Sequence, residues 1–118
     1  RQMPGELTVP QFDVLAQLWR QPAGMTAGQL TRELLVTAGN VTGIVDRLQQ
    51  LGLVQRRRLP QDRRTVEVRL TPRGRRLMQR VLPLHRRQVQ ALLAPLPPRD
   101  LARLRELLGR LGQELSRA

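Results

Sequence analysis

The chain has 118 residues, a length that fits one domain with a modest hydrophobic core. It contains no Cys and one His, which excludes disulfides and a thiol switch and leaves too few soft ligands for a zinc site, so we expect no metal and no cofactor. No apolar run approaches the ~20 residues that span a bilayer, and residues 1–30 lack a secretory signal, so we expect a cytoplasmic protein with no membrane partner.

Two capping patterns predict the first two helices. Thr8 followed by Gln11 predicts a helix over about 9–21, and Thr26 followed by Gln29 predicts a short helix over about 27–35. The apolar positions at helical spacing, which we expect to face inward, are Phe12, Leu15, Ala16 and Trp19 in the first helix and Leu30 and Leu34 in the second.

A third helix is predicted directly afterwards, with Thr37 as its N-cap and Gly52 ending it in the left-handed conformation. Its inward face consists of Val41, Ile44, Val45, Leu48 and Leu51. About three residues separate it from the second helix. Strands follow at 54–59 and 65–70, with a turn at 60–62, so the pattern predicts a helix-turn-helix with a wing.

Two long helices complete the chain. Thr71 caps and Pro72 begins a helix over about 72–94 with a bend near Pro83, and a last helix begins near Arg99. The last helix carries leucines at spacings of 3, 4, 3 and 4, typical of a coiled-coil seam, at positions Leu101, Leu104, Leu108, Leu111 and Leu115. These leucines could pack within one chain, but burial against a second copy of the chain is favoured, so we expect a homodimer. The predicted fold class is α+β, mostly helical: a winged helix-turn-helix at 8–75 and dimerisation helices at 76–118.

Positive charge is concentrated in one segment. Residues 52–87 contain twelve Arg and only the acids Asp62 and Glu67, a net charge of +10, whereas the regions on either side are close to neutral. A bias confined to a hairpin and the following helix indicates a polyanion-binding face, with a solvated charge run as the alternative.

The run from Thr37 to Gly74 resembles the multiple antibiotic resistance regulator (MarR) family. The shared features are a recognition helix containing Asp-Arg-Leu, a closing glycine, a wing with Asp-Arg-Arg at its tip, and Leu-Thr-x-x-Gly at the next helix start. The resemblance implies an obligate dimer on pseudopalindromic DNA, usually a repressor released by a small ligand. It also implies a further N-terminal helix in the dimer interface, so we expect the natural sequence to extend before Arg1.

The third helix is the candidate reader of the major groove. Its outward residues near the beginning are small or polar, which lets a helix sit deeply in the groove: Thr37, Ala38, Gly39, Asn40, Thr42, Gly43 and Arg47. Asn40 is a candidate for pairing with adenine and Thr42 for a thymine methyl or a phosphate. In the alternative reading Asn40 belongs to the helix cap and Thr42 is only solvated. Many family members carry a larger, often basic residue in place of Gly43.

The wing arginines are candidates for other contacts. Arg64 matches the position that inserts into the minor groove in the family, while Arg63 is expected to contact phosphate or pair with Asp62, which braces the turn. We assign Arg56, Arg58 and Arg73 to the DNA-binding set, although strand residues 56–58 alternate sides and cannot all reach phosphate.

The resemblance places a small-molecule effector between the winged region and the dimer helices. Its candidate lining is Phe12, Leu15, Trp19, Met78 and Leu82, with an ordinary core role as the alternative. No effector is identified by the sequence. His85 is expected to be exposed or in a core hydrogen bond.

An enzyme is not expected, because the chain has no Cys or Tyr, no glycine-rich phosphate loop and no paired carboxylates. The predicted function is a sequence-specific regulator of transcription that binds double-stranded DNA. A non-regulatory architectural or RNA-associated winged-helix module is the alternative, and it lacks the exposed aromatics that stack on bases.

Overall fold

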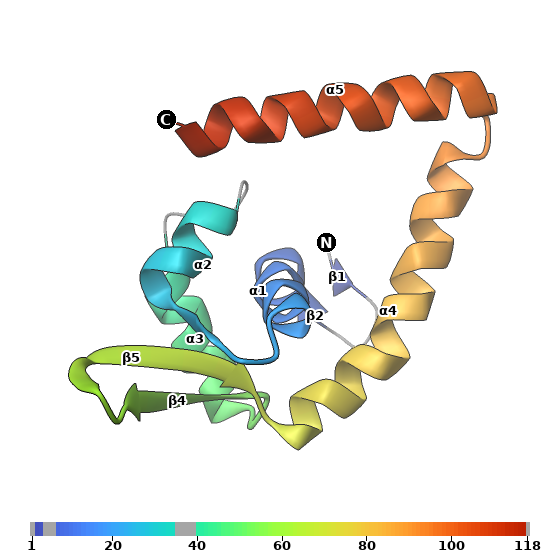
Figure 1. Ribbon diagram of the computed structural model, residues 1–118. Coiled ribbons are helices and arrows are strands. Elements are labelled where there is room, and N and C mark those ends of the chain that lie inside the picture. The colour runs from blue at the N-terminus through green and yellow to red at the C-terminus, as the bar shows by residue number, and fades with distance from the viewer. Residues whose placement is uncertain (1, 4–6, 35–39, 118) are drawn as a thin grey trace.

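The computed structural model describes residues 2–3, 7–34 and 40–117, and the side chains of residues 2, 3, 63 and 115–117 are outside this description. The described chain forms five helices and five strands (Figure 1). The helices are α1 (Val9–Arg20), α2 (Ala27–Glu33), α3 (Val41–Gln50), α4 (Pro72–Leu93) and α5 (Pro98–Arg117). The strands are β1 (Gln2–Met3), β2 (Leu7–Thr8), β3 (Met25–Thr26), β4 (Val54–Leu59) and β5 (Asp62–Leu70).

The predicted caps of the first two helices are confirmed. Thr8 and Gln11 form a reciprocal capping box at the start of α1, with the Gln11 amide hydrogen donating to Thr8 Oγ1 at 3.2 Å. Thr26 and Gln29 form the same arrangement at α2, at 3.1 Å. Each box satisfies two backbone donors that a helix start leaves free, which fixes where the chain turns into the helix.

The third helix differs from the prediction at its start. Its N-cap is Asn40 and not Thr37, and the helix begins at Val41, so the connection from α2 is longer than the three residues expected. Thr37 itself lies outside the described residues. The end of α3 is as predicted, because Gly52 adopts a positive φ of 76° and allows Leu53 to bond back to the helix.

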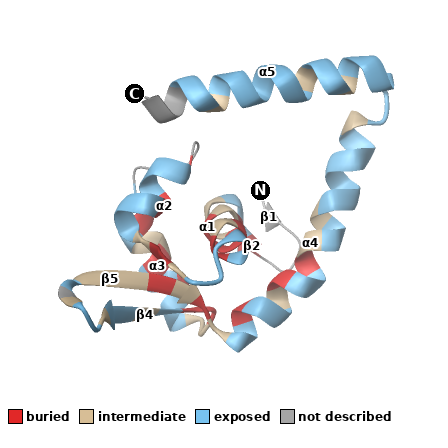
Figure 2. Cartoon of the chain, viewed as in Figure 1, coloured by how far each residue is buried: buried red, intermediate tan, exposed pale blue. Residues whose placement is uncertain are grey.

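A core of buried residues joins α1, α2, α3, the sheet and the first half of α4 (Figure 2). Leu15, Leu30, Leu48 and Met78 are fully buried in it. Trp19 is the exception to the predicted inward face of α1, because its side chain remains 37% exposed. Trp19 lies at the end of α1, one residue before Arg20, and the buried face includes Val14 and Leu18 instead.

The sheet contains one strand more than the sequence predicted. β3 pairs with β5, which also pairs with β4, giving the antiparallel order β3-β5-β4. β3 is only two residues long, too short for an alternating pattern to be recognised. β5 begins at Asp62 and not at Thr65, so the turn consists of Pro60 and Gln61 alone.

Thr71 links the wing to α4. Its hydroxyl accepts a hydrogen bond from the Gly74 amide at 3.0 Å and donates to the Gly52 carbonyl at 2.6 Å. A Cβ at Gly74 would collide with the Leu53 carbonyl oxygen. The Leu-Thr-x-x-Gly pattern therefore packs the start of α4 directly against the turn that follows α3.

Val81 is the last buried residue among the described ones, and Leu82 and His85 still pack at the margin of the core. The second half of α4 extends away from the winged region. α5 then runs back in the opposite direction, at a distance from the winged region (Figure 1). None of the described α5 residues is buried. Leu101 and Leu104 are half-buried, whereas Leu108 and Leu111 are 57% and 55% exposed.

Candidate nucleic-acid interface

The beginning of α3 presents small and polar groups to solvent. Asn40 Oδ1 accepts a hydrogen bond from the Gly43 amide at 3.2 Å, so the side chain acts as a helix cap, the alternative that the sequence left open. Thr42 is exposed and Gly43 is half-buried. The predicted contacts of Ala38 and Gly39 fall outside the described residues. To contact a base with both its amide oxygen and its amide nitrogen, Asn40 must break the hydrogen bond from the Gly43 amide or let its oxygen accept two hydrogen bonds.

Arg47 extends the exposed face of α3 by one turn. Its guanidinium donates to Gln50 Oε1 at 3.3 Å, a bond between two exposed side chains that solvent or a phosphate can replace at small cost. Arg47 therefore remains available to an anion beside the recognition helix.

The wing tip is held in shape by Asp62. One carboxylate oxygen accepts the Arg64 amide hydrogen at 3.1 Å, and the other accepts the Thr65 hydroxyl at 2.9 Å. These hydrogen bonds, that of Thr65 first, lower the pKa of the Asp62 carboxyl. Arg64 also approaches Asp62 Oδ1 with its Nε at 3.6 Å. The Asp62 side chain thus bonds to two residues that follow the turn, Arg64 and Thr65.

The hairpin is irregular at its tip. Arg58 pairs with Val66, but the next residue, Leu59, pairs with Asp62, so the residues between Asp62 and Val66 stand outside the regular register. The Arg64 side chain in this segment is 95% exposed. The side chain of Arg63 is outside the description, and its predicted phosphate contact stays a prediction.

Arg56 has a different position from the one expected of a phosphate contact. Its guanidinium forms an ion pair with Asp46 at 2.6 Å, donates to Gln49 Oε1 at 2.8 Å, and approaches the Thr42 carbonyl at 3.4 Å. All three partners belong to α3. Arg58 lies on the same face of β4, nearer the tip, and is exposed.

The opposite face of the wing has its own ion pairs. Glu67 pairs with Arg57 at 3.4 Å and with Arg69 at 3.3 Å. Arg69 also donates to the Ala23 carbonyl at 3.0 Å, in the turn that precedes β3. The hairpin base is therefore attached on one face to α3 and on the other to the α1–β3 turn.

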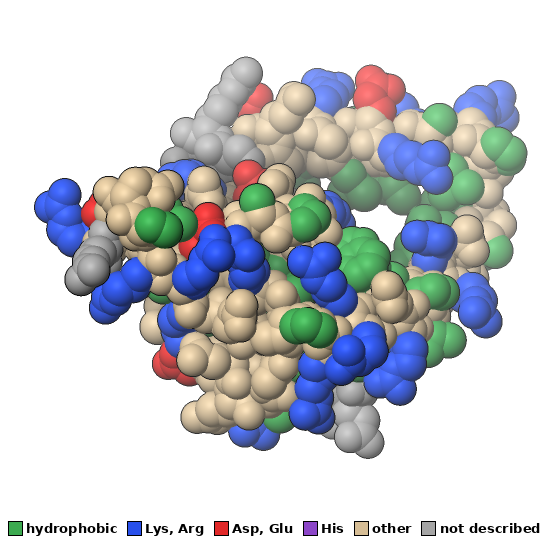
Figure 3. All heavy atoms as spheres, turned by 60° about the horizontal axis from the view of Figure 1, so that its bottom comes forward, with side chains coloured by type: hydrophobic (Ala, Val, Ile, Leu, Met, Phe, Trp, Pro, Cys, Tyr) green, Lys and Arg blue, Asp and Glu red, His purple; other side chains and the backbone are tan. Residues whose placement is uncertain are grey.

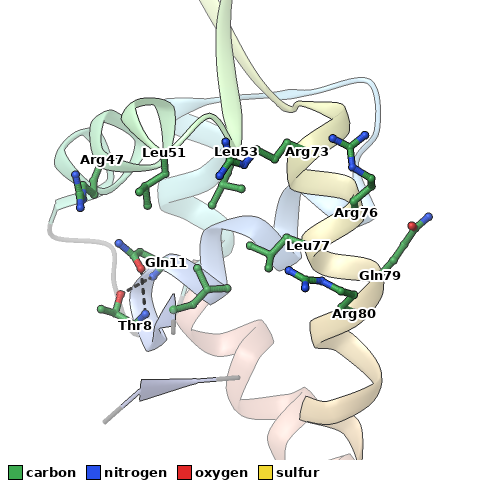
Figure 4. A pocket seen from close by; sticks show the side chains of 11 residues that line it. Thr8, Gln11, Arg47, Leu51, Leu53, Arg73, Arg76, Leu77, Gln79 and Arg80 are labelled. Carbon is green, nitrogen blue, oxygen red and sulfur yellow. Dashed lines mark hydrogen bonds between the residues drawn. The ribbon is translucent and has the colours of Figure 1, made fainter. Parts of the chain in front are cut away.

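Basic side chains spread over the face that includes the wing and the start of α4 (Figure 3). A groove of about 1150 Å³ lies among the end of α3, the start of α1 and the first turns of α4 (Figure 4). Leu51, Leu53 and Leu77 form part of its apolar floor, and its cationic rim consists of Arg47, Arg73, Arg76 and Arg80. None of the ion pairs between described residues involves these four arginines. The groove was not anticipated, because its walls come from three separate segments.

The residues predicted to line an effector cleft are placed mainly in the core. Phe12, Leu15 and Met78 are at most 5% exposed, the ordinary core role that the sequence left open for them. Leu82 packs on the margin of the core, and Trp19 borders a small pocket beside Pro22 and Arg75. An effector role stays a prediction for these residues.

His85 is in contact with α1. Its ring lies 4.4 Å from that of Phe12, centre to centre. Burial raises the pKa of the neighbouring Asp13 carboxyl, and the His85 charge partly offsets the rise.

The described part of the chain holds no helix long and apolar enough to cross a membrane.

Known proteins that resemble this chain are regulators of transcription with a helix-turn-helix. A family model described as the MarR family matches residues 7–66. The chain is 33% identical over 112 residues to the HTH-type transcriptional regulator PecS of Dickeya dadantii (strain 3937), covering 93% of this chain and 68% of that protein.

Two solved structures extend the similarity to three dimensions. A probable transcriptional regulator from Pseudomonas aeruginosa is 34% identical, with a TM-score of 0.82 over 92% of this chain and 81% of that one. Bordetella bronchiseptica BpsR, whose DNA binding is regulated by 6-hydroxynicotinic acid, is 29% identical, with a TM-score of 0.81 over 90% and 75% of the two chains.

Proposed function

The chain belongs to the MarR family of transcriptional regulators, and from this we propose that it is a ligand-responsive repressor that binds a pseudopalindromic DNA operator as a homodimer. The observation that carries the proposal is an exposed helix α3 beside a braced wing whose tip presents Arg64. A helix of this size fits the major groove, and a tip arginine fits an adjacent A·T-rich minor groove. A DNA-bound regulator of this kind acts in the cytoplasm, where the sequence predicts it.

The dimer supplies the symmetry of the operator. Each copy places one α3 and one wing on a half-site, and the exposed leucines of α5 provide the self-complementary surface that joins the copies. Repression follows if the occupied operator overlaps a promoter.

A binding titration against three nucleic acids tests DNA recognition. We expect the protein to bind a palindromic operator duplex more tightly than a scrambled duplex or a structured RNA, by a factor on the order of 10³ at physiological salt. Candidate operators can be obtained by genome-scale footprinting. Equal affinity for all three nucleic acids would favour the architectural or RNA-associated alternative.

The wing is tested separately. Arg64→Ala is expected to weaken binding by roughly 1 kcal/mol or more on operators with A·T-rich flanks and by less on G·C flanks, because a narrow minor groove attracts an inserted arginine. Arg63→Ala is the matched control, since it removes the same charge at the neighbouring position and should weaken both operators alike. The same loss for Arg64→Ala on both flanks would leave the wing as a backbone clamp.

The arginine-rimmed groove supports an anionic effector. It combines an apolar floor with four cationic side chains, and BpsR, a relative, responds to an organic acid. We expect 6-hydroxynicotinate or a similar acid to release operator DNA, and Arg76→Ala with Arg80→Ala to weaken that response. Arg103→Ala on α5 is the control. An unchanged response in the groove variant would place the effector elsewhere, with Trp19 and Leu82 as the next candidates.

A further inference from the structure

Arg56 contacts three positions on the recognition helix. Its ion pair and hydrogen bonds reach Asp46, Gln49 and the Thr42 carbonyl, which lie on successive turns of α3. We propose that Arg56 is a positioning residue, which holds the wing at a set angle to α3 and does not contact phosphate. The inference deepens the proposed function and rests on it for its consequence in DNA binding.

The register of the sheet explains why Arg56 faces α3. Arg56 pairs directly with Val68, and directly paired residues of antiparallel strands share one face of the sheet. Val68 is 2% exposed, so this face is the one packed on the core. Arg57, the next residue, is directed to the opposite face and pairs with Glu67. Three adjacent arginines in the sequence therefore have different environments.

A DNA phosphate would not easily draw the Arg56 guanidinium away from its partners on α3. Its side chain is only 30% exposed, and it contacts a carboxylate, an amide oxygen and a backbone carbonyl at once. A guanidinium has several donors in a fixed planar arrangement, so these contacts restrain both distance and orientation. A phosphate contact would require at least the ion pair with Asp46 to be broken.

The consequence is a set distance between the two DNA-reading elements. On the other face, Arg69 bonds to the Ala23 carbonyl and restrains the hairpin base. The contact of Arg56 with α3 then restricts the angle between the hairpin and α3. Without Arg56, the tip would sample several positions relative to α3. Simultaneous contact with a major groove and its adjacent minor groove would then become less favourable.

A distance measurement tests the inference without DNA. The chain has no Cys, so Gln50→Cys on α3 and Gln61→Cys at the wing turn can carry spin labels without background. Labelled protein diluted into excess unlabelled protein reports the distance within one chain. We expect Arg56→Gln and Asp46→Asn each to broaden or shift the distance distribution, while Arg57→Gln, which removes an equal charge from the same strand, leaves it unchanged. Distributions identical to the unsubstituted protein for both variants would overturn the proposal.

DNA binding provides a second readout that separates positioning from phosphate contact. Asp46→Asn removes a negative charge near the interface, so it should strengthen binding if Arg56 is thereby freed to contact phosphate. If Arg56 positions the wing, Asp46→Asn and Arg56→Gln should each reduce the preference for A·T over G·C flanks about threefold to tenfold, and the double variant should lose no more than either alone. Arg57→Gln should keep the preference.

The two proposals fail in different ways. Absence of any flank preference in the unsubstituted protein contradicts wing reading, and the distance measurement then decides the role of Arg56 by itself. A preserved flank preference in both Arg56→Gln and Asp46→Asn contradicts the positioning role, as does tighter binding by Asp46→Asn. Melting temperatures of all variants should remain close to one another, because a half-exposed ion pair contributes little to overall stability.

Discussion

The winged region and helix α5 contain comparable leucine stripes but differ in what covers them. In the winged region, Leu15, Leu30 and Leu48 are fully buried by other elements of the same chain. In α5, Leu108 and Leu111 are more than half exposed. The same residue type therefore closes a core in one region and remains exposed in the other, where we propose that a second copy covers it.

The largest expected effect comes from placing charge on the α5 surface. Leu104→Glu combined with Leu111→Glu should convert a dimer to a monomer and reduce operator affinity by about 10²–10⁴-fold, because the second half-site contact is no longer intramolecular. Light-scattering mass and operator titration measure the two effects. Ala102→Glu with Gln113→Glu, on another face of α5, should leave the dimer intact. A monomeric unsubstituted protein at micromolar concentration would contradict the dimer proposal.

Truncation of one leucine in each region sharpens the comparison. Leu48→Ala should lower the free energy of unfolding by ~2–5 kcal/mol, since it leaves a cavity in a closed core. Leu108→Ala should lower it by less, and its effect should depend on protein concentration, because in the proposed dimer this leucine contacts the second copy. Denaturant unfolding at two protein concentrations distinguishes these cases. Concentration-independent losses of equal size would indicate that α5 packs within its own chain.

The cap of α3 can be separated from base reading at Asn40. Asn40→Ala should cost ~0.5–2 kcal/mol of stability, and Asn40→Ser should retain most of it, because a serine hydroxyl also caps a helix. If Asn40 additionally pairs with a base, both variants should lose ~1–3 kcal/mol on the operator and almost nothing on scrambled DNA. Operator affinity that follows stability alone would limit Asn40 to the cap.

The smallest effects concern two carboxylates with opposite environments. The pKa of Asp62 is lowered by its hydrogen bonds, so wing-tip stabilisation should be present above pH 3.8 and lost as pH falls through the folded-state pKa. The pKa of Asp13 is raised by burial, so its contribution should be most favourable below pH 3.8 and decline as pH rises through its folded-state pKa.

Carboxyl NMR titration checks both directions. The midpoint of Asp62 should fall below 3.8 and that of Asp13 above it. Thr65→Val should raise the Asp62 midpoint, because the Thr65 hydroxyl is the largest cause of its lowering, and should leave Asp13 unchanged. Coincident midpoints for the two residues would contradict the difference in environment.

The sequence by itself determined the elements whose signals are local. Thr8, Thr26 and Thr71 each have the partner residue or the proline that their cap needs within a few positions, and Gly52 ends a helix because it tolerates a positive φ. The strands of the wing and the basic segment were readable for the same reason: alternation and charge are visible along the chain. These features also carried the family resemblance and the predicted fold class.

Only the tertiary structure decided the roles that depend on residues distant in sequence. Strand β3 is recognisable solely through its pairing with β5, and the arginine-rimmed groove exists because three segments meet. The alternation of Arg56, Arg57 and Arg58 along a strand is readable in the sequence, but their partners are not. The sheet register directs Arg56 toward α3 and Arg57 toward Glu67. Their partners lie 7–14 residues away in the sequence and come into contact only when the chain folds.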